Sequence, residues 1–416
     1  MHKHKKLTFI DLFAGCGGLS EGFLQSGKYE ALAHVEWELP MVNTLRHRLV
    51  HRWEHSNEDA LKRVIHFDIQ KTEELIAGNW SEETVETYGV TNHSIIKAEG
   101  LKGIIGEEDV DLIIGGPPCQ AYSIAGRAQD KNSMKDDYRN YLFESFVEVV
   151  KSFQPKMFVF ENVPGMLSAE PGGIPVTQRI FEAFKAIDYE IKAPSELKNV
   201  VLDASLFNVP QKRKRLILVG VKKYSDYNLN DIYAEIMKLS SDKNIPTVKN
   251  AIGELPPLFP LKETSKQDRK NISHSITGKK VLHHEPRFHN QRDINIFKKW
   301  ITDGMNKTST TEKINFYNGL MNKQSNHAKY RNLEWDKPSP TIVAHLYKDG
   351  LMFIHPDEQQ ARSISVREAA ALQSFPDDFT FLGSSAHQYK MIGNAVPVKL
   401  AESIAQGIAS YFSSIS

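Results

Sequence analysis

Residues 7–20 read LTFIDLFAGCGGLS, and this stretch decides the fold. Its first six residues have the apolar pattern of a buried strand, and the glycines that follow allow the backbone to turn sharply. A helical pattern runs from Gly18 to Ser26. The N-terminus of such a helix carries a partial positive charge, so the turn offers backbone N–H groups and a dipole to a ligand. A tight strand-to-helix turn without a ligand has the same pattern.

Strand-length apolar runs recur further along the chain, at residues 31–35, 111–115, 157–160 and 216–220. Helical patterns lie between several of them, which predicts an α/β fold with a mostly parallel, Rossmann-like sheet. From Lys222 this alternation fades, and helical periodicity returns after Ser363. We therefore predict a large domain whose first part is 1–221, an inserted smaller domain at 222–360, and a C-terminal segment, 361–416, that completes the large domain.

The composition of the 416 residues is that of a globular protein, with 40% hydrophobic and 25% charged residues. The cysteines are Cys16 and Cys119, which excludes a disulfide-rich secreted scaffold. The basic residues 1–6 are not followed by the apolar segment of a signal peptide, and no run approaches the roughly 18 apolar residues of a membrane-spanning helix. We expect a soluble, cytoplasmic protein that does not contact a membrane.

Charge is distributed unevenly along the chain. The net charge is only +1, yet residues 261–340 hold 16 Lys and Arg against 8 Asp and Glu. A local basic excess of this kind is typical of nucleic-acid binding, although a solvated lysine-rich surface gives the same count.

A second apolar segment ends at Glu36 and Trp37, 21 residues after Gly15. A carboxylate at this position of an α/β sheet can hold ribose hydroxyls, and the neighbouring indole can stack on an adenine. Asp68 ends a third apolar segment and is either an adenine contact or an ordinary helix-capping carboxylate. Ser20 occupies the position where a dinucleotide fingerprint needs glycine, which disfavours a nicotinamide cofactor.

The stretch DLIIGGPPCQ, residues 111–120, is a buried strand that ends in two glycines and two prolines. The prolines fix an extended turn that presents Cys119 at the carboxyl edge of the sheet, where ligands of open α/β sheets bind. A lone cysteine is more often an inert buried side chain, but a rigid turn at this edge is the setting that a nucleophile needs.

Two further segments place polar side chains at the same edge. Glu161 ends the strand at 157–160, as either a general acid or a structural ion-pair partner. The segment QKRKR precedes the strand at 216–220. Alternation in an extended chain turns Gln211, Arg213 and Arg215 to one face, where the guanidiniums can bind a base or a phosphate. A solvated charged edge is the alternative.

Six segments together resemble the DNA (cytosine carbon-5) methyltransferase family of bacterial restriction-modification systems. In chain order they are DLFAGCGG (11–18), GPPCQ (116–120), ENV (161–163), QKRKR (211–215), REAAALQSFP (367–376) and IGNAVP (392–397). The resemblance covers most of 7–220 and 362–412. It implies the mixed α/β sheet of S-adenosylmethionine-dependent methyltransferases, with an inserted target-recognition domain at 222–360.

The resemblance also implies a cofactor and a mechanism. Cys119 would attack carbon 6 of a flipped-out cytosine while Glu161 protonates nitrogen 3, and Arg213 and Arg215 would hold the base and its backbone. Carbon 5 would then take the methyl group. The methyl donor, S-adenosyl-L-methionine, would be held by Phe13, Ala14, Gly15, Cys16, Gly17, Gly18, Leu19, Glu36, Trp37, Asp68, Ile69, Pro117, Leu142, Asn394 and Val396.

Duplex DNA is the partner that the resemblance implies, with contacts from Gln120, Ser123, Arg127, Arg139, Gln211 and Thr341. We expect a monomer in the cytoplasm, associated with the nucleoid through DNA, and a restriction endonuclease that acts separately. Two other readings are a transfer RNA cytosine-5 methyltransferase and a catalytically silent, cofactor-binding DNA-recognition protein.

Two features fall outside the resemblance. The histidines of HHEPRFH, residues 283–289, lack the H-E-x-x-H spacing and have no cysteine nearby, so we expect no metal site. The span between Asp68 and Asp111 is long, which predicts a helical insertion near residues 76–105 with no assigned role.

Overall fold

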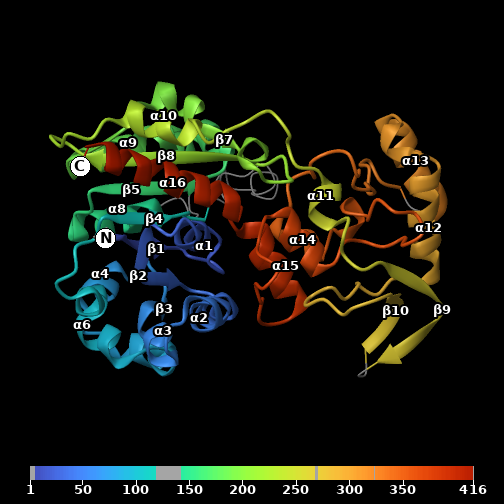
Figure 1. Ribbon diagram of the computed structural model, residues 1–416, viewed down its shortest axis with the longest axis horizontal. Helices are drawn as coiled ribbons and strands as arrows, with labels where there is room; N and C mark the ends of the chain where they lie inside the picture. Colours follow the sequence, from blue (N-terminus) through green and yellow to red (C-terminus); the bar gives the residue numbers. More distant parts are fainter. Residues whose placement is uncertain (1–4, 119–141, 268–269, 323, 416) are drawn as a thin grey trace. The chain divides into compact units, whose positions relative to one another are not determined.

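The computed structural model describes residues 5–118, 142–267, 270–322 and 324–415 (Figure 1). The chain forms two compact units. The first unit consists of Met1–Phe207, Arg213–Ser241 and Val396–Ser416, and the second consists of Asn208–Lys212 and Asp242–Ala395. Among the described residues, no helix has the length and apolar character needed to cross a membrane.

The first unit is built on one mixed sheet, which confirms the predicted α/β fold. Its strand order is β3-β2-β1-β4-β5-β8-β6, with β7 also paired to β8. Strands β1 to β5 are parallel, and β8 runs antiparallel to β5, β6 and β7. The bounds are β1 Leu7–Leu12, β2 Tyr29–Glu36, β3 Val64–His66, β4 Leu112–Gly115, β5 Met157–Asn162, β6 Tyr189–Ile191, β7 Val201–Asp203 and β8 Lys214–Lys222.

The register of the central strands brings three chain segments to one edge. Leu12 pairs with Gly115, and Gly115 pairs with Phe160. Because these strands are parallel, the residues that follow each of them lie at the carboxyl edge of the sheet. The chain turns to opposite sides after β1 and after β4, and ligands of open α/β sheets bind at such a reversal of strand order.

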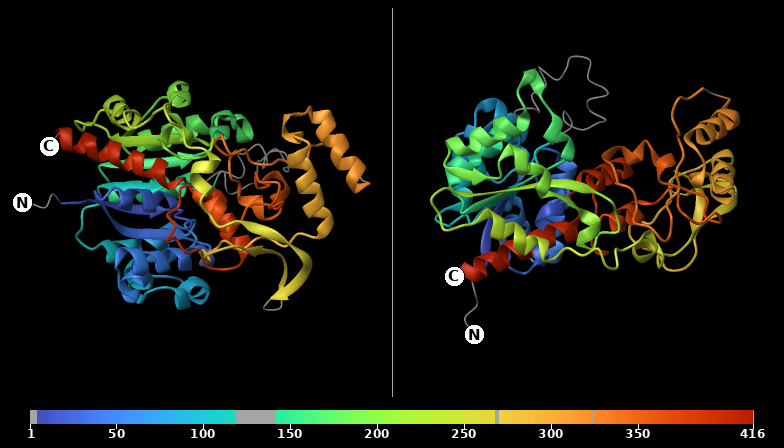
Figure 2. Two further views of the ribbon diagram at one scale, coloured as in Figure 1. Left: turned by 45° about the vertical axis from the view of Figure 1, so that its right-hand side comes forward. Right: turned by 90° about the horizontal axis from the view of Figure 1, so that it is seen from above.

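Helices cover both faces of the sheet. Helix α16 (Val398–Ile415) packs along α1 (Gly18–Gln25) and α10 (Leu229–Met237), as Figure 2 shows. Helices α8 (Leu142–Phe153) and α9 (Val176–Ala186) pack together on the other face. The chain runs in opposite directions along the sheet from β1 to β2 and from β4 to β5, so right-handed crossovers place the connecting helices α1 and α8 on opposite faces.

The predicted helical insertion is present between β3 and β4. It contains α4 (Thr72–Ala77), α5 (Glu82–Tyr88), the 3-10 helix η1 (Gly89–Thr91) and α6 (Ser94–Ile105). Helices α4 and α6 contact each other closely. Two more helices, α2 (Leu39–Trp53) and α3 (Asn57–Arg63), connect β2 to β3.

The unit boundaries differ from the predicted ones at 222 and 361. Helix α10 stays with the first unit because it packs against α16 and β8. Helices α14 (Val366–Leu372) and α15 (Ser385–Asn394) stay with the second unit, because α14 contacts α11 (Val248–Ile252) and α15 contacts the 3-10 helix η8 (Ala344–Tyr347). The chain therefore leaves and rejoins the first unit later than the composition indicated.

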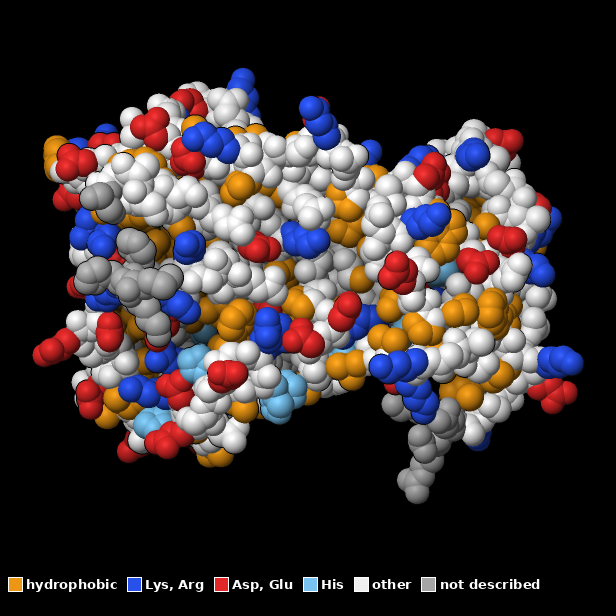
Figure 3. Space-filling model, viewed as in Figure 1, with side chains coloured by type: hydrophobic (Ala, Val, Ile, Leu, Met, Phe, Trp, Pro, Cys, Tyr) orange, Lys and Arg blue, Asp and Glu red, His pale blue; other side chains and the backbone are white. Residues whose placement is uncertain are grey.

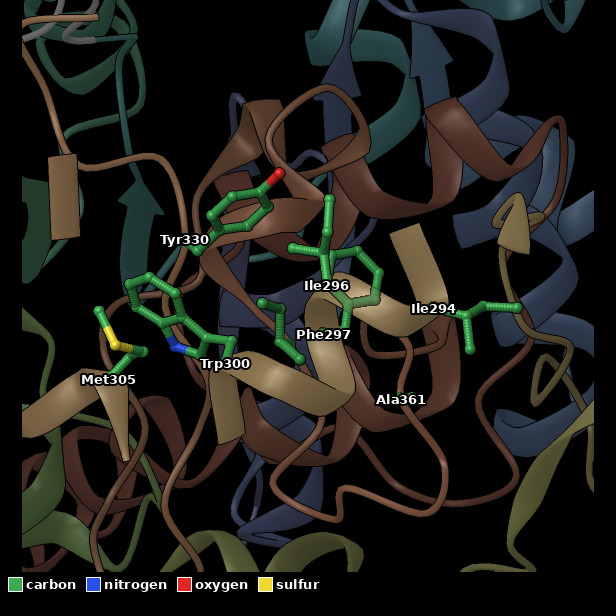
Figure 4. Close-up of a cluster of buried hydrophobic side chains, with 8 residues drawn as sticks. Ile294, Ile296, Phe297, Trp300, Met305, Tyr330 and Ala361 are labelled. Carbon is green, nitrogen blue, oxygen red and sulfur yellow. The ribbon is translucent and has the colours of Figure 1, made fainter. Parts of the chain in front are cut away.

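The second unit combines a hairpin with helices around its own core. The hairpin consists of β9 (Leu258–Gln267) and β10 (Lys270–Ile276), which pair antiparallel. Helix α12 (Gln291–Thr302) supplies much of the core, and α13 (Thr310–Met321) packs on its border. The buried side chains, seven of them labelled in Figure 4, are Ile294, Ile296, Phe297, Trp300, Met305, Tyr330, Ile354 and Ala361.

Candidate active site

The turn after β1 has an unusual backbone at the carboxyl edge of the sheet. Phe13, Gly15 and Gly17 have φ angles of 58°, 58° and 91°, in the left-handed region that favours glycine. A Cβ added at Gly17 would lie 2.6 Å from Leu45, whereas one at Gly15 would meet no atom closer than the Met41 sulfur at 4.0 Å. A ligand can therefore approach the backbone at Gly15, where a strained turn is typical of a functional site.

Glu36 joins this turn to the end of β2. One carboxylate oxygen accepts the N–H of Gly15 at 2.8 Å, and the other accepts the N–H groups of Trp37 at 2.9 Å and Glu38 at 2.8 Å. The side chain is buried. Burial raises the pKa of Glu36 to about 7, because its effect is larger than that of the three N–H donors, which lower the pKa.

The donors and acceptors around Glu36 fit the adenosine part of S-adenosylmethionine. A carboxylate offers about four lone-pair positions, so the three N–H groups leave Glu36 room to accept a ribose hydroxyl. Trp37 is 54% exposed, so its indole is available for stacking. Asp68 is half-buried, and the hydrogen bonds that we find to its carboxylate come from the backbone and side chain of Gln70.

A second buried carboxyl at this edge, Asp11, was not among the predicted site residues. One of its oxygens receives a hydrogen bond from Ser20, and the other has no hydrogen-bond partner among the described residues. Burial raises the pKa of Asp11 to about 8, so it is mainly protonated at neutral pH. Its strand is otherwise apolar except for Thr8, and nothing in the spacing marked Asp11 as a site.

The remaining predicted cofactor residues lie in several elements. Cys16 is buried, and burial raises the pKa of its thiol well above the usual range, so the thiol is inert. Asn394 is exposed at the end of α15 in the second unit. The others are buried at least in part: Ala14, Gly18, Leu19, Ile69, Pro117, Leu142 and Val396.

Glu161, at the end of β5, lies against the turn after β4. A Cβ added at Gly116 would lie 2.6 Å from a Glu161 carboxylate oxygen, so glycine is needed for this close approach. The Asn162 side-chain amide donates to the Pro117 carbonyl at 3.4 Å. These contacts anchor the Gly116–Pro118 segment beside the carboxylate. Cys119, which follows directly, lies outside the described residues, as do Gln120, Ser123, Arg127 and Arg139.

Arg215 forms an ion pair with Glu161. The distance from its Nε to the carboxylate is 2.6 Å, and each side chain is 12% exposed. The antiparallel pairing of β5 with β8 brings the two together, since Glu161 pairs with Ile217. The predicted alternation is confirmed, because Arg213 is buried and Arg215 half-buried whereas the intervening lysines are exposed.

Gln211 has a structural role in the second unit. It belongs to the second unit and is fully buried, with its side-chain oxygen accepting the N–H of Ile342 at 2.9 Å. Its amide nitrogen donates to the Leu372 carbonyl at 3.1 Å and to the Gln373 side chain at 2.7 Å. Gln211 therefore holds segments of the second unit together, and its contact with DNA stays a prediction. Thr341 is half-buried, and its hydroxyl donates to the Lys212 carbonyl at 2.7 Å.

The histidines of residues 283–289 serve the packing of the second unit. His283 accepts the N–H of Phe381, His284 contacts the Ser365 hydroxyl and the Pro256 carbonyl, and His289 contacts Ser363. No group of three or more potential metal ligands occurs within the described ranges.

Basic side chains of the second unit are partly paired. Ion pairs join Arg292 to Asp293, Lys299 to Asp303 and Lys337 to Glu334. Figure 3 shows basic side chains interspersed with acidic ones on the viewed face. On this face the basic side chains do not gather into one patch.

Comparison with known proteins identifies the family. The model of the C-5 cytosine-specific DNA methylase family matches residues 7–82 and 67–410. The chain belongs to this family. Type II methyltransferase M.Bpa9945I of Bacillus paralicheniformis is 33% identical, over 97% of this chain and 98% of the relative. Type II methyltransferase M1.HphI of Haemophilus parahaemolyticus is 31% identical, over 97% of this chain and 86% of the relative.

Solved structures agree with the fold. A protein described as a prophage-encoded DNA modification methyltransferase of E. coli superimposes with a TM-score of 0.62 at 23% identity, covering 98% of this chain and 100% of the other. Spodoptera frugiperda DNMT2 gives a TM-score of 0.51 at 14% identity, covering 97% and 99%. Family membership makes this chain a cytosine-5 DNA methyltransferase, and S-adenosylmethionine is its methyl donor.

Proposed function

We propose that this methyltransferase modifies a flipped-out cytosine, within a short specific sequence of duplex DNA, through a covalent adduct on Cys119. One observation carries the proposal: the Glu161 carboxylate, the Arg215 guanidinium and the Gly116–Pro118 turn that leads into Cys119 meet at one place. They lie at the carboxyl edge of the sheet, where the strand order reverses.

The cofactor would be held by the turn after β1 and the end of β2. The Glu36 carboxylate would accept a ribose hydroxyl, and the exposed Trp37 ring would stack on the adenine. The left-handed backbone at Gly15 allows the ligand to approach the chain closely. When bound, S-adenosylmethionine supplies the electrophilic methyl group.

The chain's own residues would then activate the cytosine. The Cys119 thiolate would form a bond to carbon 6, and Glu161 in its protonated form, oriented by Arg215, would deliver its proton to nitrogen 3, so that carbon 5 becomes nucleophilic. Once carbon 5 carries the methyl group, its proton would pass to water, the sulfur–carbon 6 bond would break to return the thiolate, and the nitrogen 3 proton would return to Glu161. Arg213 would contact the base or its phosphate. A base inside a duplex is out of reach, so it must leave the stack first.

Trapping on 5-fluorocytosine tests the adduct, because fluorine at carbon 5 cannot leave as a proton and the enzyme stays bound. We expect a denaturation-resistant complex with wild-type protein, fluorinated duplex DNA and S-adenosylmethionine, and none with Cys119→Ser. An equal yield of complex with the serine variant would remove Cys119 from the mechanism.

We further infer that the second unit is the target-recognition domain of a modification enzyme. The basic excess of residues 261–340 supports binding to phosphates, and the curated relatives are named as type II methyltransferases. Thr341, together with Ser123, Arg127, Arg139 and Gln120, would contact DNA. The enzyme would act as a cytoplasmic monomer on nucleoid DNA, beside a separate endonuclease of the same specificity.

A further inference from the structure

The outer edge of β3 lies directly beside the proposed adenosine site. Strand β3 is the last strand in the sheet order, and its His66 pairs with Glu36 of β2. The N–H of Phe67 donates to the Glu36 carbonyl of β2. Because backbone groups alternate in direction along a strand, the N–H and carbonyl groups of Val64 and His66 point away from β2. Unpaired backbone groups at a sheet edge need other partners.

Asn92, just after η1 of the insertion, supplies two of these partners. Its side-chain oxygen accepts the His66 N–H at 2.9 Å, and its side-chain nitrogen donates to the His66 carbonyl at 2.8 Å and to the Tyr88 carbonyl at 2.9 Å. Arg46 joins the same edge to the insertion, because its guanidinium donates to the carbonyls of Val64 at 2.6 Å and Thr91 at 2.9 Å.

The His66 ring extends this link to Trp37. Its Nε2 lies 3.0 Å from the Trp37 carbonyl, and its Nδ1 lies 2.8 Å from the Thr91 hydroxyl. A carbonyl only accepts, so Nε2 carries a proton. The Thr91 hydroxyl also lies 2.9 Å from the Tyr88 carbonyl, so its one proton goes either to that carbonyl or to Nδ1 of the neutral ring. Burial lowers the pKa of His66, which favours this neutral form.

Aromatic packing holds the insertion against the same segment. The rings of Trp80 and Tyr88 lie 4.8 Å and 5.2 Å from Phe67, between centroids, and Phe67 directly precedes Asp68. The insertion thus contacts residues on both sides of the proposed adenosine site, at Trp37 through His66 and at Asp68 through Phe67.

We propose that the insertion between β3 and β4 positions the adenosine-binding edge, with Asn92 and Thr91 as positioning residues for Trp37. The proposal rests on the proposed cofactor site. Neither residue needs to touch the cofactor, because each acts through His66.

The test measures the dissociation constant of S-adenosylmethionine by calorimetry without DNA, together with the thermal midpoint. Asn306→Ala is a matched control in the second unit. The Asn306 side-chain amide donates to the Asn332 carbonyl at 2.7 Å and accepts the Asn332 N–H at 3.2 Å, as Asn92 does with His66. We expect Asn92→Ala to raise the dissociation constant about tenfold. Asn306→Ala should lower the thermal midpoint similarly and leave cofactor affinity unchanged.

Every outcome is decisive. Equal cofactor affinities of the Asn92→Ala and Asn306→Ala proteins would overturn the proposal. If Asn92→Ala does not fold, Thr91→Val decides in the same way, since it removes only the hydroxyl beside His66, and an unchanged affinity would then count against the idea. Glu36→Ala separates the two proposals. If neither Glu36→Ala nor Asn92→Ala changes the cofactor affinity, the proposed cofactor site is wrong. If Glu36→Ala weakens binding and Asn92→Ala does not, only the proposed role of the insertion is wrong.

Discussion

Replacing Glu36 with alanine should weaken cofactor binding more than any other single change near β2. The substitution removes the acceptor of the N–H groups of Gly15, Trp37 and Glu38 and, in the proposed site, of a ribose hydroxyl. A hydrogen bond to a charged group contributes about 1.5–3 kcal/mol, so losing the one to the ribose costs about that much. The dissociation constant of S-adenosylmethionine should therefore rise about 10- to 100-fold.

Isothermal titration of the free enzyme measures this change directly. Glu30→Ala is a suitable control, because Glu30 is an exposed carboxylate at the opposite end of the same strand. We expect the control to bind the cofactor as the wild type does. A folded Glu36→Ala protein with wild-type affinity would refute the ribose assignment.

The pH dependence of binding follows from the same residue. Burial raises the pKa of Glu36 from 4.5 to about 7, and only the carboxylate form keeps all of its acceptor positions for the N–H groups and a ribose hydroxyl. Cofactor affinity should therefore fall as the pH decreases through 7, and it should stay nearly flat in Glu36→Gln. For folding the sign is opposite: the folded state binds this proton more tightly than the unfolded chain, so the contribution of Glu36 to stability decreases as the pH rises from 4.5 to 7.

Three other substitutions test separate parts of the account. Cys119→Ser should abolish methyl transfer to DNA while calorimetry shows nearly unchanged cofactor affinity. Glu161→Gln should lower kcat by about 10²–10⁴-fold in a single-turnover assay, with the cofactor dissociation constant retained. Glu368→Ala should cost about 3–5 kcal/mol in denaturant unfolding, because it leaves the buried Arg362 without its bidentate partner at 2.6 and 2.7 Å. Glu312→Ala, which removes the exposed member of an equivalent capping box, should cost much less.

The sequence predicts the sheet and its glycine turn well because these depend on local patterns. Strands β1, β4 and β5 are short, mainly apolar runs, and β4 and β5 end in a glycine and an asparagine, so their burial follows from the residues alone. The position of Glu36 opposite Gly15 follows from the parallel order of the first two strands. Features of this kind can be predicted without knowing which distant residues contact each other.

Features that depend on long-range pairing could not be predicted. The Glu161–Arg215 ion pair requires the antiparallel register of β5 and β8. The burial of Gln211 requires three segments of the second unit to meet around one amide. The later unit boundaries follow from the packing of α10 on α16, which no local composition records.

The most direct test of the central claim is conversion sequencing of plasmid DNA from cells that express this chain, with Cys119→Ser as the control. We expect one short motif in which nearly every copy of one cytosine is protected as 5-methylcytosine, and none with the control. Unprotected cytosines throughout, from a folded protein that binds S-adenosylmethionine, would contradict the account.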